Sequence, residues 1–318
     1  MDISSQLVWT QCVQTPTNLH PRESGGGSFS WLPCASPACQ RVLSRTCILD
    51  SDGCSYVVDA TAYTSGYLVT DTFTFGNTSV LGMVLGCSAV SMVDLSLAGA
   101  SSVIGFGRGP LSLVSQLNLS RFSYFLATDD SDSSETVIRL GDDAVPRTSG
   151  SRSTPLLRST MYTDMYYIRL TGIQRSSSRR TADGSGGVFL STTVPLTYLE
   201  EAAYSMVRRA LVTRIHSQGV SPFDSQDLEH LCYLSASFVN VKVPRLTLVF
   251  DGVETAMELR PENYFFKDGA AGGLVCLTIL PSRGGSVLGS LLQTGRNMIY
   301  DIALVKKGSN VRHISPGL

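Results

Sequence analysis

The sequence predicts an all-β protein. Of its 318 residues, 43% are hydrophobic and only 16% are charged, and 29 are glycines. Such a composition, together with many Ser and Thr residues, suits short strands joined by tight turns better than helices or a disordered chain. A chain of this length forms one large domain or two of ordinary size, and either arrangement buries a substantial core.

Short β-like segments recur along the chain, separated by turns rich in Gly, Ser, Asp and Pro. One segment differs, because apolar residues recur every four positions from Glu200 to His216, which predicts a helix with one buried face. A shorter helix is expected at Ser112–Asn118, and the polar stretch Ser176–Ser185 is expected to be a surface loop. The expected strands are Leu7–Gln11, Tyr67–Phe75, Val103–Phe106, Tyr166–Leu170, Leu246–Phe250 and Met298–Tyr300.

Charge and hydropathy argue against two classes of partner. The chain has 25 basic and 26 acidic residues and a net charge of −1, which gives no reason to expect binding to nucleic acid or to an anionic membrane. The most apolar stretch, Val80–Val93, is too short and too interrupted by Gly and Ser to cross a bilayer. We therefore expect neither nucleic acid nor a membrane as partner.

Eight cysteines, six of them in the first ninety residues, favour disulfides formed in an oxidising compartment. The alternative is a zinc site in the cluster of four between residues 34 and 54, but this cluster has no CxxC pair with the usual ligand spacing. We expect no metal. The spacing alone does not choose among the possible pairings of Cys12, Cys34, Cys39, Cys47, Cys54, Cys87, Cys232 and Cys276.

Two glycosylation acceptors, at Asn77 and Asn118, agree with passage through a secretory compartment. The first residues, MDISSQLVW, show neither the basic region nor the apolar region of a signal peptide. Because a disulfide-rich chain needs such a signal, we expect the natural start of the protein to lie upstream of this sequence.

The two halves of the chain share a pattern in which a polar loop is followed by two hydrophobic residues and a glycine. Gly105, preceded by Val-Ile, lies 103 positions after Asp2, and Gly289, preceded by Val-Leu, lies 98 positions after Ser191. Glycine at these positions lets two backbones approach where a side chain would clash. The repeat predicts two related lobes with a boundary near residues 140–160.

Residues 186–204, GGVFLSTTVPLTYLEEAAY, resemble the second active-site loop of a pepsin-like aspartic peptidase. In that family the loop consists of Gly-Gly, three hydrophobic residues, Asp, Ser or Thr, Gly and Thr. Gly186 and Gly187 match, and Ser191 stands at the position of the catalytic Asp. Asp2 matches the first catalytic Asp of the family.

Further motifs are similar to the plant nepenthesin-like branch of this family, and together they cover nearly the whole chain. The matching motifs are LVWTQC (Leu7–Cys12), LPCASPAC (Leu32–Cys39), GFGRGPLSL (Gly105–Leu113), RFSY (Arg121–Tyr124), LCY (Leu231–Tyr233), VPRLTL (Val243–Leu248) and ENY (Glu262–Tyr264).

The resemblance implies a bilobal pepsin-like fold, with two β-barrel-like lobes and a few short helices. The N-terminal lobe would span residues 1–150, truncated at its start and carrying a Cys-rich insertion at 30–54, and the C-terminal lobe would span 151–318. The branch also implies a set of four disulfides. These are Cys34–Cys54, Cys39–Cys47, Cys232–Cys276 and Cys12–Cys87.

The implied activity is that of an aspartic-type endopeptidase, which cleaves polypeptides in a cleft between the lobes with water as nucleophile and without a cofactor. A secreted or vacuolar monomer is the form that the resemblance suggests. The reaction needs two carboxylates that share one proton, one to activate the water and one to polarise the scissile carbonyl. A hydroxyl at Ser191 does not replace a carboxylate, so we expect catalysis to be impaired.

Other positions of the family's active site also depart from its pattern. Ile3 and Ser4 replace the Thr and Gly after the first Asp, and Thr193 replaces the Gly of the second loop. Thr193 is β-branched and is expected to disfavour the turn conformations that Gly allows. Tyr63 is the candidate for the flap tyrosine, although its register differs from that of the family.

The alternative role of Ser191 is that of a nucleophile, but that chemistry needs a histidine base and a group that orients it. The histidines at 20, 216, 230 and 313 lie in no such motif, and the chain has no GxSxG elbow. Three hypotheses therefore remain: an impaired endopeptidase, a non-catalytic binding protein similar to plant xylanase inhibitors, and a decayed gene product without stable function.

Overall fold

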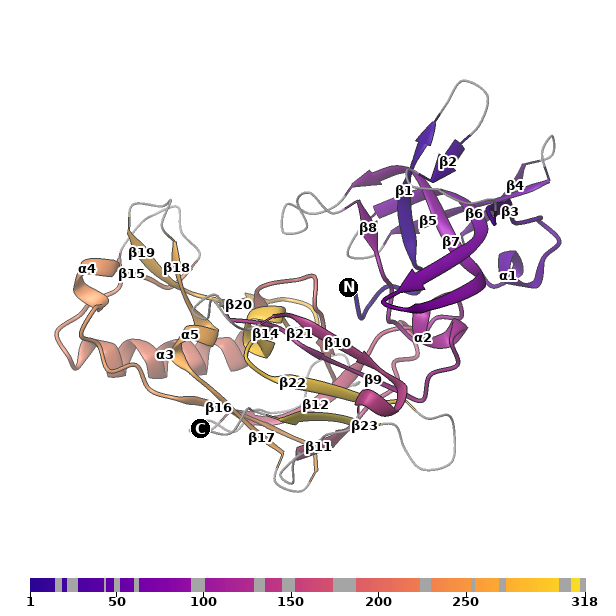
Figure 1. Ribbon diagram of the computed structural model, residues 1–318. Coiled ribbons are helices and arrows are strands. Elements are labelled where there is room, and N and C mark those ends of the chain that lie inside the picture. Colours follow the sequence, from indigo (N-terminus) through magenta and orange to yellow (C-terminus); the bar gives the residue numbers. More distant parts are fainter. Residues whose placement is uncertain are drawn as a thin grey trace. The chain divides into compact units, whose positions relative to one another are not determined.

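A computed structural model of the chain (Figure 1) describes residues 1–14, 19–21, 28–42, 44–48, 52–59, 63–92, 101–128, 135–144, 152–173, 187–223, 230–252, 255–268, 273–302 and 310–314. Most of the described elements are strands, and the helices other than one are short, so the predicted all-β class is confirmed. The expected loop at Ser176–Ser185 lies outside the described residues.

The chain divides into two compact units. Unit 1 consists of Met1–Leu119 and Thr160–Tyr166, and unit 2 consists of Ser120–Ser159 and Tyr167–Leu318. Thr160–Tyr166 joins unit 1 because the Tyr166 hydroxyl donates to the Phe106 carbonyl at 2.9 Å, and because the Arg108 guanidinium lies over the Tyr166 ring. The compact units thus divide the chain differently from the lobes 1–150 and 151–318 that the family pattern suggests.

Unit 1 is built on one twisted sheet with the strand order β2-β1-β7-β6-β5-β4, in which β3 pairs with β6 and β8 pairs with β1. Its long strands β6 and β7 form an antiparallel hairpin, and β1 pairs in parallel with β7. The elements are β1 (Trp9–Gln14), β2 (Leu19–Pro21), β3 (Ser30–Trp31), α1 (Pro37–Gln40), β4 (Arg45–Ile48), β5 (Gly53–Asp59), β6 (Tyr63–Phe75), β7 (Thr78–Met92), β8 (Ser102–Val103) and α2 (Leu113–Gln116).

The core of unit 1 forms around Trp9 and Tyr56, both almost completely buried. The Tyr56 hydroxyl lies 3.0 Å from the Thr64 hydroxyl, which in turn donates to Ser88 at 2.9 Å. This chain of hydroxyls satisfies polar atoms that burial would otherwise leave unpaired. Burial raises the pKa of Tyr56 to about 12, although the hydrogen bonds with Thr64 and Ser88 act in the opposite direction.

Two of the four implied disulfides are correct and two are wrong. Cys12–Cys87 and Cys232–Cys276 form as expected, but Cys34 bonds to Cys47 and Cys39 bonds to Cys54. The reason is local: α1 directs the buried Cys39 into the core, where the buried Cys54 of β5 also lies, and this leaves Cys34 for the exposed Cys47 on edge strand β4.

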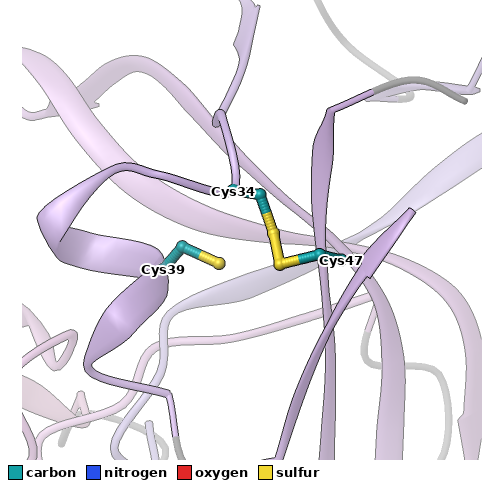
Figure 2. A group of neighbouring side chains, drawn as sticks. All are labelled: Cys34, Cys39 and Cys47. Carbon is teal, nitrogen blue, oxygen red and sulfur yellow. A yellow bond between two sulfur atoms is a disulfide. The ribbon is translucent and has the colours of Figure 1, made fainter. Parts of the chain in front are cut away.

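Figure 2 shows the Cys34–Cys47 bond with the Cys39 sulfur directed toward it. The three sulfurs lie within 4.8 Å of one another, which is close enough for a metal site. All three are disulfide-bonded, however, so they offer no thiolates as ligands.

The described residues of unit 2 form three sheets. A seven-stranded sheet has the order β17-β16-β12-β13-β21-β14-β20, a five-stranded sheet has the order β10-β9-β22-β23-β11, and a small sheet has the order β15-β19-β18. The strands are β9 (Arg121–Phe125), β10 (Val137–Leu140), β11 (Arg152–Pro155), β12 (Tyr167–Ile173), β13 (Gly187–Leu190), β14 (Thr197–Glu200), β15 (Cys232–Leu234), β16 (Leu246–Phe250), β17 (Ala256–Leu259), β18 (Phe265–Asp268), β19 (Leu274–Leu277), β20 (Ile279–Ser282), β21 (Ser286–Leu288), β22 (Asn297–Asp301) and β23 (Asn310–Ile314).

The long helix of unit 2, α3 (Glu201–His216), confirms the prediction from four-residue periodicity. The apolar face named by that periodicity is buried, from Ala203 through Val207 and Leu211 to Ile215. The other predicted helix is shorter than expected, since α2 covers only Leu113–Gln116. The remaining helical segments are η2 (Gly141–Ala144), α4 (Ser235–Phe238), α5 (Pro261–Tyr264) and η3 (Ser290–Gln293).

Candidate functional site

Asp2 lies in a buried loop of unit 1, with 1% of its surface exposed. Its backbone is fixed by a bridge to Gly105, in which the Asp2 N–H donates to the Ile104 carbonyl at 2.9 Å and the Phe106 N–H donates to the Asp2 carbonyl at 2.8 Å. One carboxylate oxygen, Oδ1, accepts from the Ser4 N–H at 2.8 Å and from the Ser4 hydroxyl. The carboxylate is therefore oriented by its own loop.

Ser191 lies at the end of β13 in unit 2 and is completely buried. Its N–H donates to the Leu288 carbonyl at 3.2 Å. Its Oγ accepts from the Val194 N–H at 3.0 Å and the Thr193 N–H at 3.3 Å, and it lies 3.2 Å from the Thr193 hydroxyl. The hydroxyl thus closes a tight local turn.

Asp2 and Ser191 occupy equivalent positions in their units. Each donates its N–H to the carbonyl of the residue just before a glycine, Ile104 in unit 1 and Leu288 in unit 2. In each case a side-chain oxygen accepts from the N–H two residues further along. Ser191 therefore stands in unit 2 where Asp2 stands in unit 1, and the chemical difference between the two loops is a hydroxyl in place of a carboxylate.

Gly105 and Gly289 lie where the backbones of loop and strand come closest. A Cβ at Gly105 would lie 2.7 Å from the Ser5 carbonyl oxygen, and a Cβ at Gly289 would lie 2.5 Å from the Pro195 carbonyl oxygen. Both distances are shorter than any ordinary contact, and both neighbours are backbone atoms that cannot rotate away. The structure thus places both glycines as the internal repeat implies.

Sequence reasoning missed Gln293, which stabilises the Ser191 loop by hydrogen bonds to its backbone. Its completely buried side chain donates from Nε2 to the carbonyls of Ser191 at 2.8 Å, Leu288 at 3.0 Å and Gly289 at 3.2 Å. Its Oε1 accepts from the hydroxyl of Tyr124 on β9. The sequence offers no clear signal for this role, because Gln293 lies among other polar residues, Ser290, Thr294 and Arg296, and a buried amide finds its several partners only in the folded chain.

Thr193 does not adopt the left-handed conformation that Gly allows, which agrees with the expectation for a β-branched residue. Among the described residues, positive φ in a non-glycine occurs only at Asp52 and Asn118. Because the loop keeps an ordinary backbone conformation at Thr193, a β-branched residue is accommodated there. Ile3 and Ser4, the departures in the first loop, are likewise buried within it.

Tyr63 begins β6 and is partly buried, opposite Asp59 in the β5–β6 hairpin. The residues between these two positions lie outside the described part of the chain. Its role as a flap tyrosine stays a prediction.

A serine-nucleophile arrangement finds no support in the described residues. The hydrogen bonds of Ser191 Oγ are to its own loop, and no described histidine is among its partners. His216, at the end of α3, lies instead 3.5 Å from the Ser221 hydroxyl. Within the described part of the chain, no base is in contact with the Ser191 hydroxyl.

Both predicted glycosylation acceptors are exposed. Asn77 lies in the turn between β6 and β7, and Asn118 follows α2 with φ of 49°. Exposure in a turn is what attachment of a glycan requires, and modification itself stays a prediction. No helix in the described part of the chain is long and apolar enough to span a membrane.

Comparison with known proteins gives the family. The chain is 33% identical to aspartic proteinase nepenthesin-1 of Nepenthes gracilis, over 95% of this chain and 71% of that protein. It belongs to the pepsin-like aspartic peptidase family. The resemblance inferred from the motifs, including its nepenthesin-like character, is thereby confirmed.

Other comparisons agree with this family and add a second group of relatives. Aspartyl protease family protein 2 of Arabidopsis thaliana is 29% identical over 97% of this chain and 66% of that protein. Families described as xylanase inhibitor N-terminal and xylanase inhibitor C-terminal match residues 1–142 and 165–306.

Solved structures confirm the bilobal pepsin-like fold. Basic 7S globulin from soybean has a TM-score of 0.74 at 18% identity and covers 98% of this chain and 86% of that chain. Conglutin gamma from lupine seeds has a TM-score of 0.71 at 21% identity and covers 99% of this chain and 87% of that chain. At these identities the likeness concerns the fold alone.

Proposed function

We propose that this member of the aspartic peptidase family is catalytically impaired and acts by binding a partner protein. The observation that carries the proposal is the equivalence of Ser191 and Asp2 in their two loops. Family catalysis needs two carboxylates with a shared proton, so that one is charged and the other is protonated. A serine hydroxyl carries no charge in the working range of pH and supplies neither function.

The size of the impairment follows from how coupled catalytic groups behave. Removing one member of a catalytic unit costs about 10⁴-fold or more in kcat, since the remaining members do not work alone. Asp2 keeps its loop and its hydrogen bonds with Ser4, but it has no carboxylate at the equivalent position of the other loop. The retained fold, with its intact packing glycines, supports a binding role rather than decay.

The first test is digestion of denatured casein and haemoglobin by the purified chain across acid pH, with and without pepstatin. We expect no pepstatin-sensitive cleavage from a protein that unfolds in a single cooperative transition. Pepstatin-sensitive cleavage would contradict the proposal, because it would show that another group takes over the function of the second carboxylate. Absence of a cooperative transition would favour the decayed gene product instead.

The matches to xylanase inhibitor families suggest the kind of partner. If the chain acts like the proteins that those descriptions name, it binds a microbial glycoside hydrolase. Residual activity of a panel of microbial endoxylanases, measured with native protein and with heat-denatured protein as control, tests this directly. Inhibition by the native protein alone supports the binding role, and unchanged activity across the panel removes this class of partner.

The second candidate function is a residual aspartic endopeptidase. It is favoured by the 33% identity to nepenthesin-1 and by the buried, hydrogen-bonded Asp2. In either case we propose a polypeptide as substrate or partner, a monomeric state, and a secreted or vacuolar location. The four disulfides and the exposed acceptor asparagines support that location.

A further inference from the structure

Unit 2 carries a groove that is separate from the Ser191 loop. It lies between α3, the segment that leads into β16, and edge strand β17; Figure 1 labels α3, β16 and β17. Its volume is about 700 Å³, which suits a short stretch of extended peptide better than a single small ion. In the sheet order, β16 and β17 are separated from β13, the strand that carries Ser191, by β12.

The rim of this groove is basic. Arg214 from α3 and Lys242 and Arg245 from the segment before β16 are exposed, and Glu258 of β17 is the single acidic residue among those that line it. The lining residues therefore carry a net charge of +2, in a chain whose net charge is −1. Such a local excess of one sign attracts the opposite charge.

Glu258 does not neutralise this rim. Its carboxylate lies 3.8 Å from the Arg245 guanidinium, and the two side chains are 60% and 76% exposed. An ion pair this exposed contributes little and leaves the arginine available to a competing carboxylate. Behind the rim, Arg296 donates to the Glu258 carbonyl, and burial together with Arg260 lowers the pKa of Arg296 to about 10, so that it stays charged at neutral pH.

The groove is held in shape by hydrogen bonds between side chains and backbone groups. The Gln218 side chain bridges the end of α3 to Lys242, accepting from its N–H at 2.8 Å and donating to its carbonyl at 3.1 Å. The Arg214 carbonyl at this end of the helix already accepts from Ser217 and Gln218. Because the Arg214 carbonyl is already paired, the group that this end of the helix offers to a ligand is the Arg214 guanidinium.

The floor of the groove is apolar. Leu211 and Leu246 are buried beneath it, and Val243 and Pro244 are half-buried at its wall. None of the described residues that line it is aromatic, so it lacks the flat rings on which sugar rings usually stack. Cations above an apolar floor match a peptide that alternates acidic and apolar side chains better than they match an acidic polysaccharide.

We propose that this groove binds an acidic peptide segment of a partner protein, with its carboxylates at Arg214, Lys242 and Arg245 and its apolar side chains on the floor. The proposal does not depend on whether Ser191 impairs catalysis, because it concerns other elements of unit 2. The affinity of the groove for the acidic peptide falls as the salt concentration rises, since the basic rim is exposed to solvent.

The test is fluorescence anisotropy of the whole chain with a fluorescein-labelled peptide of Glu-Glu-Leu-Gly repeats. We expect binding that the triple variant Arg214→Gln/Lys242→Gln/Arg245→Gln weakens about ten-fold. The matched control Arg139→Gln/Arg158→Gln/Arg283→Gln removes the same charge from exposed arginines of unit 2 that do not line the groove, and it should leave the affinity unchanged. Glu258→Gln should tighten binding several-fold.

Thermal unfolding of each variant is compared with that of the wild-type chain, to establish that the substitutions leave the fold intact. Equal affinity of the wild-type chain and the groove variant would overturn the proposal, as would an equal loss in the control variant. Binding of polygalacturonate that depends on the three rim cations, without binding of the acidic peptide, would also overturn it by assigning the groove to a polysaccharide. A peptide with Gln in place of Glu should bind at least ten-fold more weakly, and equal binding of both peptides would contradict the role of charge.

Discussion

At the scale of single residues, the same backbone geometry carries two different chemistries. Asp2 and Ser191 make corresponding hydrogen bonds, but only Asp2 has a carboxylate. The sequence predicted this difference, because each loop is followed about a hundred residues later by two hydrophobic residues and a glycine, which aligns Ser191 with Asp2. It did not predict that the second loop forms without a left-handed conformation at Thr193, since a residue type alone does not give φ.

Gly289 gives a prediction at this scale. Gly289→Ala introduces a Cβ against the Pro195 and Leu196 backbones, which cannot move without shifting the Ser191 loop. We expect the free energy of unfolding to fall by about 1–3 kcal/mol or more. Urea denaturation measures this change.

Gly285→Ala is the matched control for that measurement. A Cβ at Gly285 meets no atom within 4 Å, and its φ is not positive. The control should stay within about 0.5 kcal/mol of the wild-type chain. Equal losses of unfolding free energy in the two variants would show that the close backbone approach at Gly289 does not cause the destabilisation.

At the scale of elements, patterns that arise within one segment were predictable and those that depend on distant partners were not. The four-residue period located α3, and the apolar run at Leu246–Phe250 located β16. The strand expected at Val103–Phe106 is reduced to β8, because Gly105 there joins the Asp2 loop by a single bridge. The pairing of Cys34 and Cys39 depends on how α1 packs, which the spacing of the cysteines does not reveal.

Gln293, in η3, connects two sheets of unit 2 and gives a second prediction. Gln293→Leu removes three donated hydrogen bonds and leaves the Tyr124 hydroxyl without this acceptor. Each buried polar group left unsatisfied costs about 1–3 kcal/mol, so we expect a loss of about 3 kcal/mol or more in the free energy of unfolding. Chemical denaturation of the variant measures it.

Gln293→Glu separates hydrogen bonding from side-chain size. A carboxylate facing three carbonyls is disfavoured, which places its folded-state pKa above the ordinary value of about 4.3. A group with a raised folded-state pKa contributes its stability below the unfolded pKa and loses it as pH rises. The deficit of this variant relative to wild type should therefore shrink between about pH 7 and pH 4, and a pH-independent deficit would contradict the donor role.

At the scale of the whole molecule, several buried tyrosines tie stability to alkaline pH. Burial raises the pKa of Tyr56 to about 12, and it also raises the pKa of Tyr124, Tyr166 and Tyr264. In the unfolded chain these phenols ionise near pH 10. The stability that they contribute is therefore complete below about pH 10 and is lost as pH rises through the folded-state pKa values.

We accordingly expect the free energy of unfolding to fall steeply above about pH 10. Tyr56→Phe should make this fall shallower, because one ionising phenol has been removed, while Tyr162→Phe, at an exposed position, should leave the slope unchanged. Urea denaturation at a series of alkaline pH values measures the slope. Identical slopes in wild type and Tyr56→Phe would show that Tyr56 ionises equally in both states.

The fold of the whole chain was predictable because its motifs are spread along the sequence and keep the order of the family. The candidate site was predictable in its residue positions and not in its supports, since Gln293 acts through contacts that only folding creates. The basic groove was not predictable from the sequence either, because residues 214, 242, 245 and 258 come together only when α3 packs beside β16.

Whether Ser191 impairs catalysis is decided by the ratio of kcat/KM for the wild-type chain to that for Asp2→Ala, with an unfolded protein substrate at acid pH. Both proteins are purified in parallel, so that a contaminating peptidase contributes equally to each. If Ser191 has removed the second carboxylate function, the ratio is close to one. A wild-type value about 10³-fold or more above that of Asp2→Ala would contradict the account and show a working aspartic peptidase.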